Sequence, residues 1–211
     1  GGEPLMNFDL VKKLVAYGRE EEKKYDKHFR FTITTNGMLL NKEIEDFINE
    51  NMDNVVLSID GRKEINDEMR PTINGKGSYD VIVPKFKELI DKRGDKDYFI
   101  RGTFTNENLD FSEDLKNFYS HGFKKTSIEP VVTDEREPYA IREEHLDKIL
   151  SEYEKMSKDY IDIRKKDKDF SFFHFIIDLS QGPCIVKRTV GWGAGSEYGA
   201  ITPQGEIYPC H

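Results

Sequence analysis

The segments that favour β-strands end on side chains that can bind a polar ligand. Hydroxyl, amide, carboxylate and guanidinium groups stand at or near five successive strand ends: Glu3, Thr35, Asn36, Ser58, Asp60, Arg101, Thr103 and Glu129. In a barrel of parallel strands, ligands bind where the loops after the strands converge, at the carboxyl ends. The sequence therefore predicts a polar ligand site that several strand ends build together.

Arg101 is the residue that most needs an ionic partner. It lies within the apolar-rich segment 98–104, where an unpaired guanidinium would be costly. Glu129, at the end of the next predicted strand, could supply the anion, and so could the carboxylate of a bound ligand. Glu3 and Glu129 could instead form the general acid/base pair of an ordinary β/α-barrel lyase. These alternatives stay open on the residues alone.

Alternating strands and helices must position these groups. Strands are expected over 29–35, 55–59, 98–104 and 126–128, and helices over 41–49, 79–93, 113–120 and 143–165. An N-terminal helix should carry one apolar stripe made of Leu10, Val11, Leu14, Val15 and Tyr17. The long charged helix should turn four side chains inward: Leu146, Ile149, Leu150 and Tyr153. This rhythm predicts an α/β fold, an incomplete parallel (β/α)6 TIM-like barrel over residues 1–177.

A second module is expected over residues 178–211, where glycines accumulate and helical periodicity ends. Segments 198–202 and 206–208, joined by Pro203-Gln204-Gly205, predict a β-hairpin. The two cysteines, Cys184 and Cys210, are too few for a disulfide framework and indicate metal or redox chemistry. Both ends of the chain are interpreted as cuts, so this module is expected to be truncated.

Charge and hydropathy exclude several classes of partner. The 211 residues carry a net charge of −8, which argues against nucleic acid as the main partner. No apolar stretch approaches the roughly 20 residues that span a bilayer, so no membrane association is expected. A cytoplasmic location is the default expectation.

Short motifs in order along the chain carry a family resemblance. Gly1-Gly2-Glu3-Pro4 matches a GGEP motif, and Thr34–Gly37 matches a strand that ends in TNG. Ser58–Gly61, Arg70-Pro71 and Gly75–Tyr79 match the series S-[LI]-D-G, R-P and G-x-G-S-[YF]. Together these motifs resemble the radical S-adenosylmethionine (SAM) superfamily.

The resemblance implies a SAM site at the strand ends. The backbone of residues 1–4 would receive the SAM amino group, Ser58 and Arg101 would hold its carboxylate, and Asp60 or Asn36 would approach the ribose. The implied SAM-binding residues are Gly1, Gly2, Glu3, Pro4, Thr35, Asn36, Ser58, Asp60, Arg101, Glu129 and Val131. A catalytic [4Fe–4S] cluster is also implied. Its CxxxCxxC loop is absent from this sequence, so the chain alone is expected to be inactive.

A narrower resemblance concerns the branch with a C-terminal auxiliary-cluster (SPASM) module. The segments 101–105, 128–132, 137–142 and 172–175 are similar to maturases of six-cysteine (SCIFF) peptides. This implies thioether cross-linking of a Cys-rich ribosomal precursor peptide through a 5′-deoxyadenosyl radical, with a low-potential electron donor. Cys184 and Cys210 would ligate an auxiliary [4Fe–4S] cluster. Trp192 stands where the family usually has a further cysteine.

Two other functions stay open. Anaerobic sulfatase maturases are similar, although they usually carry Asp where His211 follows Cys210. Trp192 favours a degenerate barrel that binds SAM or a peptide without radical chemistry. No residue is assigned as the catalytic base.

Overall fold

The computed structural model describes residues 2–176 and 199–209 and divides the chain into two units, Gly1–Phe175 and Ile176–His211. Predictions that concern Gly1, Cys184, Trp192, Cys210 and His211 lie outside the described residues. The domain boundary predicted after residue 177 lies there as well.

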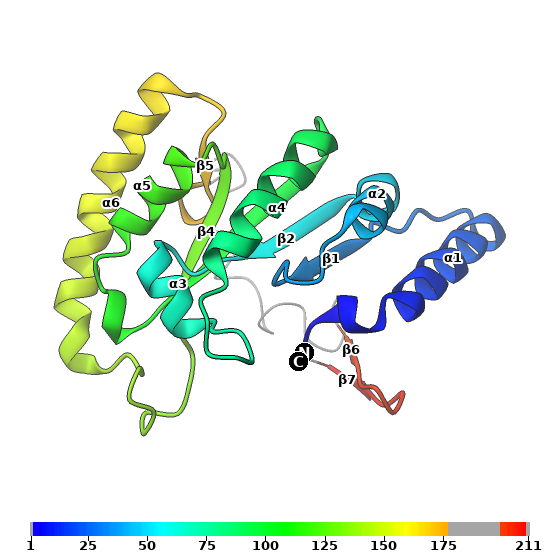
Figure 1. Ribbon diagram of the computed structural model, residues 1–211, viewed down its shortest axis with the longest axis horizontal. Helices are drawn as coiled ribbons and strands as arrows, with labels where there is room; N and C mark the ends of the chain where they lie inside the picture. The colour runs from blue at the N-terminus through cyan, green and yellow to red at the C-terminus, as the bar shows by residue number, and fades with distance from the viewer. Residues whose placement is uncertain (1, 177–198, 210–211) are drawn as a thin grey trace, which may run out of the picture. The chain divides into compact units, whose positions relative to one another are not determined.

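The first unit is built on five parallel strands in the order β1-β2-β3-β4-β5, which confirms the predicted α/β partial barrel (Figure 1). The strands are β1 (Thr32–Thr35), β2 (Asn54–Ser58), β3 (Asp97–Phe104), β4 (Lys125–Pro130) and β5 (Ser171–Phe172). Sequential strands are neighbours and each crossover carries helix, as expected for repeated βαβ units. All strand carboxyl ends therefore lie at one edge of the sheet.

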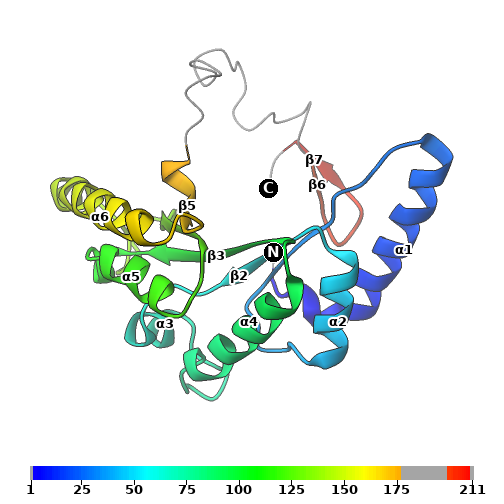
Figure 2. The ribbon, with the colours of Figure 1, turned by 90° about the horizontal axis from the view of Figure 1, so that it is seen from above.

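Helices connect the strands and cover one side of the sheet (Figure 2). The α-helices are α1 (Phe8–Tyr25), α2 (Lys42–Asn51), α3 (Lys63–Met69), α4 (Tyr79–Arg93), α5 (Ser112–Ser120) and α6 (Leu146–Lys166). The 3₁₀ turns are η1 (Pro4–Asn7), η2 (Asn106–Asn108), η3 (Glu143–His145) and η4 (Phe173–Phe175). α2 begins where the Asn41 side chain accepts the Ile44 amide at 3.0 Å, a standard N-cap.

The core lies between the sheet and the helices. Alternate residues of the central strands, among them Leu57, Ile100 and Phe104, are fully buried against the helices. Phe86 of α4 packs on the turn after β1, where Gly37 has φ +76° and a Cβ atom would lie 2.2 Å from the ring. The turn can approach α4 this closely because residue 37 is glycine.

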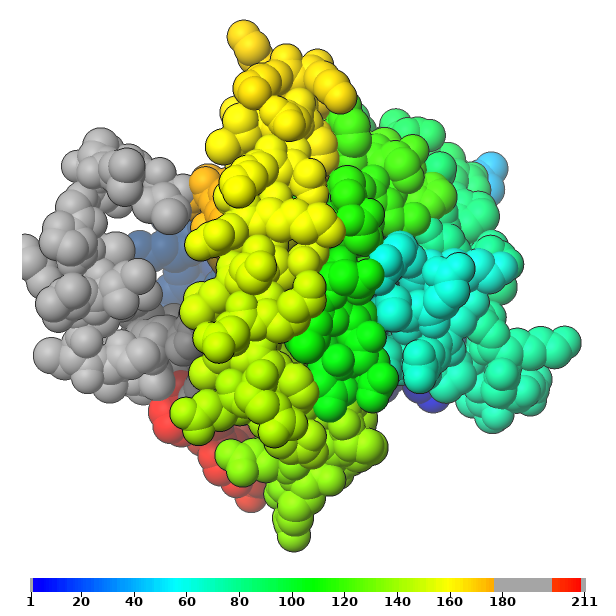
Figure 3. Space-filling model, turned by 90° about the vertical axis from the view of Figure 1, so that its left-hand side faces the viewer, coloured from blue at the N-terminus to red at the C-terminus, as the bar shows by residue number. Residues whose placement is uncertain are grey.

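In two helices, the structure buries fewer apolar residues than the sequence predicts. Leu146 and Leu150 of α6 were expected inward but are exposed, while Ile149 and Met156 are buried. On α1, Leu10, Leu14 and Tyr17 are also exposed. The reason for α6 is geometric: it packs along α5 at the edge of the unit, so only a narrow stripe of its surface meets the core (Figure 3).

Ser78 precedes α4, but its side chain does not cap the helix. Its hydroxyl donates to the Arg70 carbonyl oxygen at 2.7 Å and accepts from the Asn66 side chain at 3.0 Å. The first amide of α4, that of Tyr79, donates instead to Asp67 at 2.8 Å. The 70–78 loop is therefore fixed to α3, a helix that was not predicted from the sequence.

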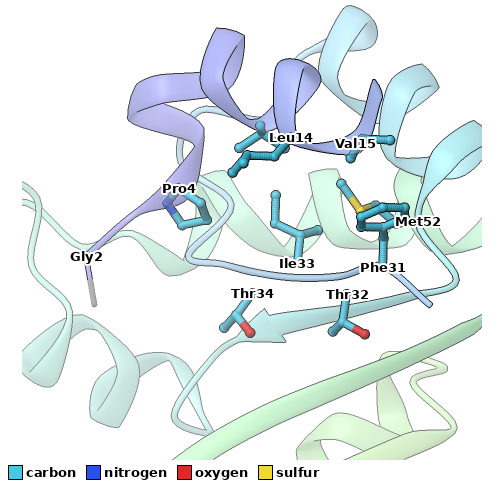
Figure 4. A pocket seen from close by; sticks show the side chains of 10 residues that line it. Gly2, Pro4, Leu14, Val15, Phe31, Thr32, Ile33, Thr34 and Met52 are labelled. Atoms are coloured by element: carbon cyan, nitrogen blue, oxygen red, sulfur yellow. The ribbon is translucent and has the colours of Figure 1, made fainter. Parts of the chain in front are cut away.

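A groove of about 490 Å³ runs beside β1 (Figure 4). Mostly apolar side chains of α1, β1 and their flanks line it: Gly2, Pro4, Val11, Leu14, Val15, Phe31, Thr32, Ile33, Thr34 and Met52. Within residues 2–176 and 199–209, no strand pairs with the outer edge of β1. The groove and the free strand edge thus lie together.

The second unit contains the predicted hairpin. β6 (Ala200–Ile201) pairs antiparallel with β7 (Ile207–Tyr208). Gly205, with φ +87°, donates its amide to the Thr202 carbonyl oxygen at 2.9 Å and closes the turn. Among the helices of the described residues, none combines the length and apolar character needed to cross a membrane.

Candidate functional site

A polar row crosses the sheet near its carboxyl edge. Ser58 of β2 is in register with Arg101 of β3, and Arg101 is in register with Ser127 of β4. The flanking residues of β3, Ile100 and Gly102, are buried against the helices, so Arg101 points to the other face, and its side chain is 54% exposed. The row joins hydroxyl groups and one cation on the face that the helices leave open.

Of the two anions considered for Arg101, the Glu129 carboxylate is the one that binds it in the structure. Its Nη2 donates to Glu129 Oε2 at 3.0 Å, and the Ser127 hydroxyl donates to Glu129 Oε1 at 3.1 Å. The remaining N–H groups of the guanidinium have no partner among the described residues. Arg101 can therefore stay bound to Glu129 and still bind the carboxylate of a ligand with other N–H groups.

Glu3 joins the N-terminal segment to the end of β1. Its Oε1 accepts the Thr35 hydroxyl at 2.8 Å and the Leu5 amide at 3.0 Å, and its Oε2 accepts the Asn36 amide at 2.7 Å. Thr35 is buried and also accepts the Gly37 amide at 3.1 Å. Both side chains are thus used to hold the loop at the end of β1.

The Asp60 side chain is used within the protein. Asp60 is 4% exposed, and Arg70 donates to it twice, from Nε at 2.7 Å and from Nη2 at 2.9 Å. The Thr103 amide donates to Asp60 Oδ1 at 2.9 Å. The structure therefore leaves this carboxylate no open side for a ribose. Of the two residues expected to approach one, Asn36 has an amide NH₂ with no partner in the part of the chain that the structure describes, although its Oδ1 accepts the Met38 amide at 3.0 Å.

An ionic cluster that was not predicted from the sequence ties two strand-end loops together. Arg62, after β2, donates from both Nη atoms to Asp110 at 2.9 and 2.8 Å, and its Nε lies 2.9 Å from Asp114. Asp114 is fully buried and also accepts the Arg62 amide at 2.9 Å and the Asn108 side chain at 3.2 Å. Gly61 allows this approach, since a Cβ atom there would lie 2.4 Å from Asp114. The sequence signal for this cluster is the four-residue spacing of the two aspartates, but this spacing does not show which residue pairs with them.

Burial raises the pKa of Asp114 to about 6, even though Arg62 and Asn108 favour the charged form. The hydrogen bonds from Arg62 lower the pKa of Asp110 in the same cluster. The two carboxylates therefore differ because one is desolvated and the other remains partly in water.

The raised pKa of Asp114 predicts a pH-dependent stability. Since the native pKa lies above the ordinary value of 3.8, the native state binds this proton more tightly. Asp114 therefore lowers the free energy of unfolding as pH rises from about 4 to about 6, by about 3 kcal/mol in all. Urea unfolding of wild type and Asp114→Asn should show a larger wild-type advantage at about pH 4.5 than at about pH 7.5. An equal difference at both pH values would contradict the assignment.

A metal centre is not formed by the described residues. No group of three His, Cys, Asp or Glu side chains in ranges 2–176 and 199–209 is placed to hold a metal ion. Both cysteines, Cys184 and Cys210, lie outside those ranges.

Comparison with known proteins extends these observations. The Radical SAM superfamily matches residues 1–110. An uncharacterized protein of Methanocaldococcus jannaschii is 31% identical over 173 residues, which cover 80% of this chain and 58% of that protein. The cysteine-type anaerobic sulfatase-maturating enzyme of Clostridium novyi is 27% identical over 219 residues and is matched along 100% of this chain and 57% of its own length. The chain thus spans less than two thirds of these relatives.

Solved structures share the fold. Native anSMEcpe with bound AdoMet and the Kp18Cys peptide matches with a TM-score of 0.67 and 22% identity, over 77% of this chain and 46% of that one. Streptococcus suis SuiB bound to S-adenosylmethionine matches with a TM-score of 0.64 and 17% identity, over 100% of this chain and 48% of that one. The sheet, the ordered motifs and the superfamily match over residues 1–110 agree, and the chain belongs to the radical SAM superfamily.

Proposed function

We propose that this chain is the SAM-binding part of a longer radical SAM enzyme that modifies a peptide. The observation that carries the proposal is the polar row, in which Arg101 is in register with Ser58 and has N–H groups without a partner among residues 2–176 and 199–209. A cation and a hydroxyl on adjacent strands suit the carboxylate of an amino-acid ligand. Superfamily membership makes SAM that ligand.

The residues of the chain then have separate tasks. Ser58 and Arg101 hold the SAM carboxylate, the backbone of residues 1–4 receives the amino group, and Asn36 approaches the ribose. Val131 borders the site after β4, where its amide donates to the Phe104 carbonyl oxygen at 2.9 Å and fixes the chain direction. Another group, Glu3, Thr35, Asp60 and Glu129, orients these residues through the hydrogen bonds described above.

The iron–sulfur cluster needs ligands that this sequence does not contain. A CxxxCxxC loop has three cysteines, and the 211 residues include two, both in the segment after residue 177. We therefore assign the catalytic [4Fe–4S] cluster to cysteines outside this sequence. When both are bound, the cluster and SAM supply the radical chemistry, and the chain supplies binding and orientation. Cys184 and Cys210 are proposed as auxiliary-cluster ligands.

Two peptide modifications are the candidates. The motifs shared with six-cysteine peptide maturases favour thioether cross-linking of a Cys-rich precursor peptide, with electrons from a low-potential donor. The similarity to the Clostridium novyi sulfatase-maturating enzyme along the whole chain favours a second candidate, maturation of a sulfatase cysteine. A thioether keeps the cysteine sulfur in the peptide, whereas oxidation of the cysteine to an aldehyde removes it.

The test uses the full-length protein, reconstituted with iron and sulfide without oxygen. Incubation with SAM, a chemical reductant and a Cys-containing peptide should release 5′-deoxyadenosine, and mass spectrometry of the peptide separates the two modifications by their sulfur content. Absence of 5′-deoxyadenosine from protein with an intact cluster spectrum would refute the proposed function and favour a degenerate binding barrel.

A further inference from the structure

A second groove, of about 780 Å³, opens beside the candidate site. Its lining comes from η1, the loop after β1, the loop between α3 and α4, and the start of α4: Glu3, Met6, Asn36, Met38, Leu39, Arg70, Pro71, Thr72, Ile73, Asn74, Lys76, Gly77, Ser78, Val81 and Ile82. Glu3 and Asn36 belong to the candidate site as well. The volume lies in the range of sites that bind small molecules or a few peptide side chains. The groove is thus continuous with the place where SAM is proposed to bind.

Exposed apolar side chains gather at this groove. Met6, Leu39, Ile73 and Val81 come from four different segments, and each is exposed although each is large and apolar. Single exposed apolar residues are ordinary, but several that converge on one groove indicate a binding surface. We call these four residues the apolar rim.

Ile73 is presented by a turn that is closed by its own hydrogen bonds. The Thr72 amide donates to the Lys76 carbonyl oxygen and the Gly75 amide to the Thr72 carbonyl oxygen, both at 2.8 Å. The Thr72 hydroxyl donates to the Lys76 carbonyl oxygen at 2.9 Å and accepts the Lys76 amide at 3.1 Å. Gly75, with φ +70°, allows the tight bend. The turn therefore holds a fully exposed isoleucine in place before any partner arrives.

Both ends of this loop are also held in place. Arg70 is paired with the buried Asp60, and the Ser78 hydroxyl donates to the Arg70 carbonyl oxygen at 2.7 Å. A loop that is ordered in advance loses little conformational entropy when a ligand binds. The same ion pair that orders the strand end of β2 thus also orders the groove.

We propose that this groove binds an extended apolar segment of the peptide substrate, next to the residue that reacts. The inference rests on the proposed function, and it adds where the peptide is recognised and which side chains it presents. A peptide is the occupant that fits because the groove runs into the candidate site at Glu3 and Asn36, so one chain can fill the groove and reach the reacting position. Apolar side chains of the peptide would cover the apolar rim.

The experiment compares peptide binding by the wild type and by the Ile73→Ser variant, both as full-length, cluster-reconstituted protein. The probe is fluorescently labelled Kp18Cys, the peptide named in the neighbouring structure. Ile73→Ser should weaken its Kd about tenfold and raise KM for the peptide with little change in kcat, because one aliphatic contact is lost. The Kd for SAM and the release of 5′-deoxyadenosine without peptide should not change. Ile161→Ser on α6, where Ile161 is 52% exposed away from the groove lining, is the matched control.

Several outcomes would overturn the inference while the proposed function stands. One is an active wild type whose affinity for Kp18Cys equals that of Ile73→Ser and of the double variant Leu39→Ser/Ile73→Ser. Another is an active wild type that does not bind Kp18Cys. A change of oligomeric state in the Ile73 variant would assign the groove to a second copy instead. Absence of 5′-deoxyadenosine in the wild type would be a failure of the proposed function itself.

Discussion

Replacing Arg101 with alanine should weaken SAM binding about tenfold to a hundredfold, the range expected when a charge-assisted pair of hydrogen bonds is lost. The side chain is 54% exposed on the open face of the sheet, and its one hydrogen-bond partner among the described residues is Glu129. The change therefore removes little packing, so its effect should appear in ligand affinity and not in folding.

Arg101→Lys separates charge from geometry. Lysine keeps the cation, but its three N–H groups sit on one atom and cannot offer a carboxylate the two parallel N–H groups of a planar guanidinium. Its SAM affinity should lie between those of wild type and Arg101→Ala. Equilibrium dialysis of SAM against cluster-reconstituted full-length protein measures all three, and Arg136→Ala, an exposed arginine that pairs with Asp134, is the control. Equal SAM affinity in wild type and Arg101→Ala would place the carboxylate elsewhere.

We expect Glu129 to position Arg101 and not to bind SAM directly. Because it accepts from both Ser127 and Arg101, Glu129 orients the guanidinium and also offsets its charge. Beside the SAM carboxylate, the Glu129 carboxylate would meet a like charge, which is unfavourable. We therefore expect Glu129 to act through Arg101, a distinction that the order of motifs alone does not make.

The strand and helix order could be predicted because its signals are local. Helix α4 was predicted over 79–93 and ends at those residues, and β3 differs by one residue, since apolar periodicity and flanking polar residues mark both. The short α3 was missed because it buries Asn66 and lacks an apolar stripe. Leu146 and Leu150 were misplaced because sequence periodicity shows that a helix has an apolar side but not how much of it a neighbour covers.

The candidate site was predictable in part. The strand ends could be aligned from the sequence because parallel strands end at one edge, and this brought Ser58, Arg101 and Glu129 together. The partners of Asp60 and Asp114 could not be predicted, because Arg70 and Arg62 reach them through loop conformations that depend on packing. An aspartate at a strand end has the same sequence signature whether it binds a ligand or an arginine.

Asp60 is where we expect the largest loss of stability from a single substitution. Asp60→Ala would leave Arg70 without its partner, would leave the Thr103 amide without its acceptor, and would free the Arg70 end of the 70–78 loop. Breaking a buried pair from one side commonly costs 3–5 kcal/mol, and because Arg70 is about one third exposed we expect about 3 kcal/mol. Urea unfolding followed by two spectroscopic probes measures this loss, provided that the two transitions coincide.

A double variant shows whether the loss comes from the orphaned charge. Asp60→Ala/Arg70→Met removes both charges, so it should be more stable than Asp60→Ala alone, since the methionine leaves no unpaired cation at the edge of the core. Asp134→Ala, which breaks an exposed pair with Arg136, should leave the midpoint unchanged. If Asp60→Ala unfolds at the wild-type midpoint, the Asp60–Arg70 pair does not hold the loop. The apolar groove would then need another source of its order, because Arg70 and Ser78 are the two ends from which Ile73 is presented.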